Sequence, residues 1–161
     1  MLIYLPMVDT KECLSCNQIL DVSQFPAGRA NCATCKIAQA QVRISGSYES
    51  YLRNLYSGSR SAVKQGKRNK VMEWAITPDD LVWLWEKQKG RCAISGVFLT
   101  HHRDGSGKKD YNASIDRISG EKGYTPKNIQ LVCYRINIMK HTLPEDMFYW
   151  WVKTINDFSC D

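Results

Sequence analysis

The sequence predicts an α+β protein in which a small cysteine-rich module precedes helices and a compact ββα unit. Three observations lead to this fold class: two close cysteine pairs near the N-terminus, apolar residues at helical spacing in the middle, and a strand–loop–strand–helix pattern in the C-terminal half. We therefore expect three segments: a zinc-binding module over 1–45, a basic and a capped helix over 46–90, and a ββα core with a C-terminal helix over 91–161.

The cysteine pairs are Cys13-x2-Cys16 and Cys32-x2-Cys35, separated by a polar, turn-rich stretch. Each pair can sit on a tight turn that points both sulfurs at one ion, and two such turns complete the tetrahedral S₄ shell that zinc prefers. The stretch between them has too little apolar material to fold unaided, so a bound metal would supply much of its folding energy. We expect a structural zinc, because protein ligands fill all four positions.

Charge and the absence of targeting features limit the classes of partner. The net charge is +6, which favours a polyanion without proving one. The apolar run from Leu2 to Val8 is too short for a membrane span and is a poor signal peptide. We therefore expect no membrane partner and a cytoplasmic location, where thiols stay reduced and clustered cysteines favour metal binding over disulfides.

Apolar residues from Tyr48 to Val63 recur at helical spacing and predict a helix with a basic stripe. The stripe is a candidate phosphate-contacting surface, although a solvated face is the ordinary alternative. Thr77-Pro78-Asp79-Asp80 then predicts a capped helix start, and Gly90 its stop. The candidate DNA-binding residues are Arg53, Arg60, Lys64, Lys67, Arg68 and, farther along the chain, Lys140.

The C-terminal half predicts a strand over 113–118, a turn-rich loop over 119–127, a strand over 128–132 and a helix from Cys133 to about His141. A last helix begins at Pro144-Glu145-Asp146 and carries a heavy apolar load. This helix is expected to seal the core or to form a dimer contact.

The run SIDRISGEKGYTPKNIQLVCYRINIMK resembles the HNH (ββα-metal) nuclease motif of phage-type enzymes. Upstream, ITPDDLVWLWEKQKGRCAISGVFL resembles the segment that precedes this motif, so the similarity covers roughly residues 50–145. The cysteine pairs add a likeness to zinc-containing members such as the PacI-type restriction enzymes. The resemblance implies a metal-dependent endonuclease that acts on double-stranded DNA and leaves 5′ phosphate and 3′ hydroxyl ends.

The resemblance also assigns roles to three residues. Asp116 matches the carboxylate that binds the catalytic metal, and Asn137 matches the second protein ligand, on the helix. Asn128 matches the Asn that braces the loop through backbone hydrogen bonds. Carboxylate and amide oxygens suit Mg²⁺ or Mn²⁺.

The usual general base of the family, a His directly after the metal-binding Asp, is replaced here by Arg117. Arginine stays protonated and cannot easily take a proton from water, but it can clamp a phosphate oxygen. We expect the base to come from elsewhere, with His102 ahead of His101. His141 is a candidate third metal ligand, a phosphate contact or an ordinary helix-end histidine.

Several alternatives stay open at this point. A catalytically inactive, zinc-containing DNA-binding module would keep the zinc and the basic stripe and use Arg117 only for binding. Homing, restriction and phage DNA-processing nucleases would share the same residues. A homodimer is the assembly that a symmetric double-strand cut would require. Cys92 and Cys133 each lack a cysteine three positions on, where Ser95 and Ile136 stand, so we expect both to be buried rather than to bind zinc.

Overall fold

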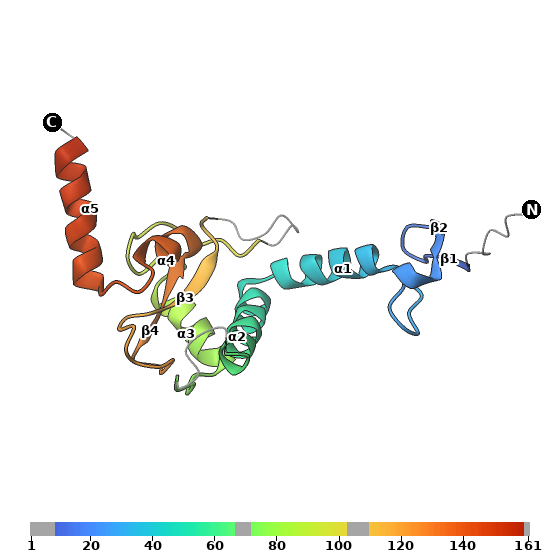
Figure 1. Ribbon diagram of the computed structural model, residues 1–161, viewed down its shortest axis with the longest axis horizontal. Helices are drawn as coiled ribbons and strands as arrows, with labels where there is room; N and C mark the ends of the chain where they lie inside the picture. The colour runs from blue at the N-terminus through green and yellow to red at the C-terminus, as the bar shows by residue number, and fades with distance from the viewer. Residues whose placement is uncertain (1–8, 67–71, 103–109, 160–161) are drawn as a thin grey trace, which may run out of the picture. The chain divides into compact units, whose positions relative to one another are not determined.

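The computed structural model describes residues 9–66, 72–102 and 110–159, and the chain divides into two compact units, residues 1–43 and 44–161. Helices combine with two separate two-stranded antiparallel sheets, which is the α+β class expected from the sequence (Figure 1). The helical segment and the ββα segment share one hydrophobic core within the second unit. Within the described ranges, no helix is both long and apolar enough to cross a bilayer.

The first unit is built from very short elements. β1 (Thr10–Glu12) pairs antiparallel with β2 (Ile19–Asp21), and the turn between them carries two of the four clustered cysteines. Asn17 adopts a left-handed φ of 54° in this turn, a conformation that Asn tolerates better than most residues. The 3₁₀ helix η1 (Val22–Gln24) follows, and α1 (Ala33–Ser45) starts directly after Cys32.

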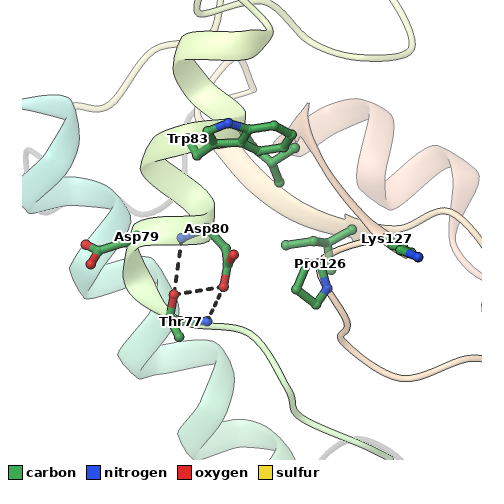
Figure 2. A pocket seen from close by; sticks show the side chains of 8 residues that line it. Thr77, Asp79, Asp80, Trp83, Pro126 and Lys127 are labelled. Atoms are coloured by element: carbon green, nitrogen blue, oxygen red, sulfur yellow. Dashed lines mark hydrogen bonds between the residues drawn. The ribbon is translucent and has the colours of Figure 1, made fainter.

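In the second unit, α2 (Tyr48–Lys64) and α3 (Pro78–Lys87) both begin at side-chain caps. Ser47 accepts a hydrogen bond from the backbone of Ser50, and Thr77 forms a reciprocal capping box with Asp80 (Figure 2). The predicted start of α3 is therefore confirmed. Gly90 has a φ of 65° just beyond the end of α3, which is the backbone conformation that favours glycine there.

The ββα unit consists of β3 (Ala113–Arg117), β4 (Ile129–Cys133) and α4 (Tyr134–Lys140). The strands are antiparallel, with Asp116 opposite Gln130. α2 contacts β3 and α4 contacts both strands, and the hydroxyl of Tyr51 on α2 donates to the carbonyl of Ala113 at 2.9 Å. β3 is thereby fixed from the side of α2 as well as by its strand partner.

The side-chain amide of Gln88, directly after α3, hydrogen-bonds the backbone of β4 as a neighbouring strand would. The Gln88 side chain donates to the carbonyl of Leu131 at 2.8 Å and accepts from its backbone N–H at 3.0 Å. Cys92 and Cys133 lie in the core, each 3% exposed, so their predicted burial is confirmed.

The loop between β3 and β4 is fastened to the segment before α3. The backbone N–H of Tyr124 donates to the carbonyl of Glu73, and Ala75 donates back to Tyr124, both at 2.8 Å. A Cβ added at Gly123 would lie 2.5 Å from the Glu73 carbonyl oxygen, so this close approach requires glycine.

α5 (Glu145–Ser159) touches the core only through its first turns. Phe148 is the one buried residue of the described helix, while Trp150 and Phe158 are 55% and 86% exposed. The expectation that this helix seals the core is therefore wrong beyond Phe148. The alternative expectation, a dimer contact, stays a prediction.

Candidate functional site

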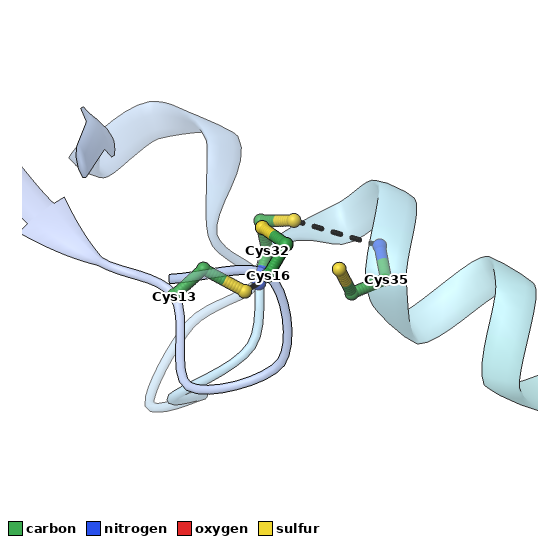
Figure 3. Close-up of side chains that lie close together, drawn as sticks. All are labelled: Cys13, Cys16, Cys32 and Cys35. Carbon is green, nitrogen blue, oxygen red and sulfur yellow. Dashed lines mark hydrogen bonds between the residues drawn. The ribbon is translucent and has the colours of Figure 1, made fainter. Parts of the chain in front are cut away.

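The four cysteines of the first unit gather at one point, as Figure 3 shows. Cys13 and Cys16 lie on the turn after β1, Cys32 directly precedes α1, and Cys35 lies in its first turn. Their sulfur atoms all lie within 4.8 Å of one another. Four thiolates around one zinc ion at about 2.3 Å would stand roughly 3.8 Å apart, so only a small contraction separates the cluster from a tetrahedral site.

Backbone N–H groups already favour negative charge at this cluster. The N–H of Cys32 donates to Cys13 Sγ at 3.2 Å, and the N–H of Cys35 donates to Cys32 Sγ at 3.5 Å. The first of these bonds lowers the pKa of Cys13 to about 6. The hydrogen bond with Cys32 and those with the other sulfurs raise the pKa of Cys35 to about 12. Without a cation, the sulfurs therefore share protons that a metal ion would displace.

The second candidate centre is the carboxylate of Asp116 on β3. Asp116 is only 4% exposed, and an ionised carboxylate is buried at high cost unless it is paired and hydrogen-bonded. Lys140 Nζ lies 3.2 Å from this carboxylate, and Gln130 Nε2 donates to its Oδ2 at 3.0 Å. The carboxylate is thus held by β4 and by the end of α4.

Lys140 was expected on a DNA-contacting surface, and the structure corrects this. Its side chain is 2% exposed, and besides Asp116 its Nζ donates to the carbonyl of Arg117 at 3.1 Å. The physical reason is the burial of Asp116, because a buried carboxylate requires a nearby positive charge.

Asn137 lies one helical turn before Lys140 and holds the same face of β3. Its Nδ2 donates to Ser114 Oγ at 2.7 Å and to the carbonyl of Ile115 at 3.2 Å. Ser114 and Asp116 project to one side of β3, because side chains alternate along a strand. Asn137 and Asp116 therefore belong to the same face of the ββα unit, which is the side that α4 covers.

Asn128 closes the loop between the strands. Its Oδ1 accepts from the backbone N–H of Ser119 at 3.0 Å, and its Nδ2 donates to the carbonyls of Ser119 and Gly123 at 3.1 and 2.9 Å. These are the loop-bracing contacts expected of this residue.

Arg117 also serves the loop in this structure. Its Nη1 donates to the carbonyls of Gly120 and Lys122 at 2.7 and 3.1 Å, and its guanidinium lies 5.5 Å from the ring centre of Tyr124. Strand alternation directs its side chain away from the Asp116 face. The phosphate clamp expected of Arg117 stays a prediction.

The two histidines expected as general bases lie near the start of β3, whereas Asp116 lies near its end, and their role as bases stays a prediction. The carbonyl of His102 accepts from Asn112, which directly precedes β3, and four residues of strand, about 13 Å, separate Asn112 from Asp116. His101 packs against the rings of Trp85 and His102, and burial, followed by the charge of His102, lowers its pKa. His141 is exposed, with its Nδ1 3.2 Å from Thr142 Oγ1.

The basic stripe on α2 is described as far as Lys64, and Lys67 and Arg68 lie outside the described residues. Arg60 and Lys64 are exposed, while Arg53 forms an exposed ion pair with Asp79 of α3 at 3.0 Å. The stripe therefore has an acidic neighbour that the sequence of α2 alone does not reveal. A pocket between α3 and the approach to β4, drawn in Figure 2, is lined by other residues than the predicted catalytic ones.

Two residues at the Asp116 centre were not predicted from the sequence. Gln130 is buried and bridges Asp116 to Glu145, the first residue of α5. A polar residue inside the otherwise apolar strand Ile129–Cys133 was the available signal for Gln130. Nothing local marked Glu145, because its carboxylate reaches the site through tertiary packing.

No known family model matches the chain, and no curated protein matches it. Among solved structures, the chain is similar to the rare-cutting HNH restriction endonuclease PacI, with 20% identity, 91% of this chain and 94% of that chain covered, and a TM-score of 0.45. The functional assignment of this chain therefore rests on its own residues.

We expect the purified protein to hold one zinc ion in the four-cysteine cluster, and Cys16→Ser or Cys35→Ser to lose it because the thiolate shell is broken. Zinc affinity should fall as the pH falls, since the proton on the Cys35 thiol competes with the ion. The number of zinc ions per protein chain is measured by elemental mass spectrometry. Cys92→Ala, outside the cluster, should keep the zinc, and a wild-type protein free of metal would contradict the assignment.

Lys140→Met should lower the free energy of unfolding by about 3 kcal/mol, because Asp116 then stays buried without its counter-charge. The double variant Asp116→Asn/Lys140→Met should recover much of this loss, since no charge is left buried. Denaturant titration measures both. Lys153→Met, which breaks an exposed ion pair with Asp157, is the control and should cost under about 1 kcal/mol. Equal stabilities for Lys140→Met and wild type would refute the pairing.

Proposed function

We propose that the chain is a metal-dependent endonuclease that hydrolyses phosphodiester bonds in double-stranded DNA. One observation carries the proposal: a buried carboxylate, Asp116, and a helix amide, Asn137, share one face of a ββα unit whose sequence resembles the HNH motif. Carboxylate and amide oxygens together form a donor set that suits Mg²⁺ or Mn²⁺.

In this proposal, Asp116 and Asn137 would hold the divalent cation through their side-chain oxygens. Asn137 Nδ2 is bound to Ser114 and Ile115, so the amide is already oriented by β3. When bound, the cation would polarise the scissile phosphate and neutralise charge on the leaving oxygen. Lys140 keeps the buried carboxylate paired before a cation arrives.

The remaining residues of the second unit position this centre and the DNA. Asn128 and Arg117 hold the loop between the strands closed, and Arg60 and Lys64 on α2 supply exposed positive charge for phosphates. The four-cysteine cluster would hold a structural zinc ion. A cytoplasmic location, which keeps those thiols reduced, belongs to the same proposal.

More specifically, we propose a site-specific endonuclease of the restriction or homing type. Two copies of the chain would act together to cut both DNA strands. This use of two copies is supported by the single Asp116 centre within the described chain, because one centre cuts one strand at a time.

The competing function is a DNA-binding module without catalysis. Two contacts favour it: Lys140 neutralises the carboxylate that should bind metal, and the guanidinium of Arg117 is occupied by loop carbonyls. This module would bind DNA with the same basic surface and leave it intact.

Incubation of the protein with supercoiled plasmid and genomic DNA, in Mg²⁺ or Mn²⁺, separates the two functions. The nuclease should cut in a metal-dependent way, and Asp116→Ala should lower the rate roughly a hundredfold or more, the scale of losing a main electrostatic stabiliser. Asp157→Asn removes an exposed carboxylate of α5 and should cut like wild type. If the protein slows the migration of DNA in a gel but leaves the DNA intact with both metals, the chain is instead a binding module.

A further inference from the structure

Glu145 brings a second carboxylate to the Asp116 centre. The Nε2 atom of Gln130 donates one hydrogen to Asp116 Oδ2 and the other to Glu145 Oε2, each at 3.0 Å. Twice this distance, about 6 Å, is therefore the greatest separation that the two carboxylate oxygens can have. At that separation, a water molecule placed between the two oxygens can lie about 3 Å from each of them, which is hydrogen-bonding distance.

The position of Glu145 is fixed by the docking of the first turns of α5. Phe148 is 4% exposed, and its backbone N–H donates to the carbonyl of Pro144 at 3.0 Å. The hydroxyl of Tyr149 donates to the carbonyl of Ile94 at 3.3 Å. Glu145 is thus held by backbone and core contacts, although the rest of the helix is exposed.

The charges around Glu145 suit a proton acceptor. Both carboxylates accept from the same amide group, and Lys140 pairs with Asp116, so the three charged groups carry one net negative charge. On α5 itself, Asp146 and Tyr149 are the neighbouring ionisable groups, and both are neutral or negative rather than positive. Glu145 is consequently the carboxylate of this group that no lysine pairs with among the described contacts.

The other candidate acceptors are less well placed. Arg117 stands where the HNH motif has a histidine, but its guanidinium is permanently charged and bound to loop carbonyls. His101 and His102 follow Thr100, which pairs with Asn112 directly before β3, whereas Asp116 lies near the end of that strand. His141 follows Lys140 directly but lies on the surface against Thr142.

We propose that Glu145 is a catalytic residue that accepts the proton of the attacking water, a role that rests on the proposed nuclease function. The water oxygen forms a bond to phosphorus while its proton passes to the Glu145 carboxylate. The bond between phosphorus and the 3′ oxygen breaks, and the 3′ oxygen takes a proton from solvent. Glu145 then releases its proton to solvent, so the enzyme returns to its starting state.

The test compares Glu145→Gln with the matched variant Asp146→Asn, which neutralises the adjacent, exposed carboxylate of the same helical turn. Glutamine keeps the shape of Glu145 and an oxygen that can accept from Gln130. The measurements are the single-turnover rate of DNA cleavage at saturating Mn²⁺ and, separately, the Mn²⁺ dissociation constant by calorimetry.

Glu145→Gln should lower the cleavage rate by roughly 10²- to 10³-fold, the scale of a lost general base, and leave the Mn²⁺ dissociation constant within about threefold of wild type. Asp146→Asn should change neither. A parallel loss of Mn²⁺ affinity would make Glu145 a ligand and overturn the proposal, as would a loss that appears in His141→Gln and not in Glu145→Gln.

The outcome also separates this role from the proposed function. If Asp116→Ala abolishes DNA cutting but Glu145→Gln cuts at the wild-type rate, only the role of Glu145 is overturned. A wild-type protein that cuts no DNA overturns the nuclease function and this role together.

Discussion

The buried ion pair between Lys140 and Asp116 constrains the whole ββα unit. A carboxylate that is 4% exposed must be paired and hydrogen-bonded, and the two groups that satisfy it come from different elements: Lys140 from the end of α4, and Gln130 from β4. These contacts join α4 to both strands of the sheet. The same pairing supplies the opposite charge that a buried carboxylate needs.

From this pair, the surrounding structure follows in steps. Asn137, one turn earlier on α4, is brought over β3 and tied to Ser114 and Ile115. Gln130 uses its second hydrogen to draw in Glu145, so the start of α5 becomes part of the centre. Asn128 and Arg117 hydrogen-bond the loop between β3 and β4. Lys140 stabilises the carboxylate, and it would compete with the proposed cation for it.

Local features of the fold could be predicted from the sequence, whereas the partners inside the site could not. The cysteine spacing, the cap at Thr77 and the two strands depend on neighbouring residues, and the structure contains them. The burial of Lys140, the ion pair of Arg53 with Asp79 and the approach of Glu145 join residues from separate elements, where spacing gives no signal. The sequence of α5 predicted a core helix because it is rich in apolar residues. Apolar content alone does not show whether another part of the protein packs against those residues.

The measurement that tests the nuclease interpretation most directly is a crystal structure with Mn²⁺, recorded at the manganese absorption edge. We predict an anomalous peak about 2.1 Å from an Asp116 carboxylate oxygen and from Asn137 Oδ1, the distance typical of small divalent cations and oxygen. Manganese bound elsewhere, with Lys140 still paired to Asp116 and Asn137 turned away, would contradict the assignment.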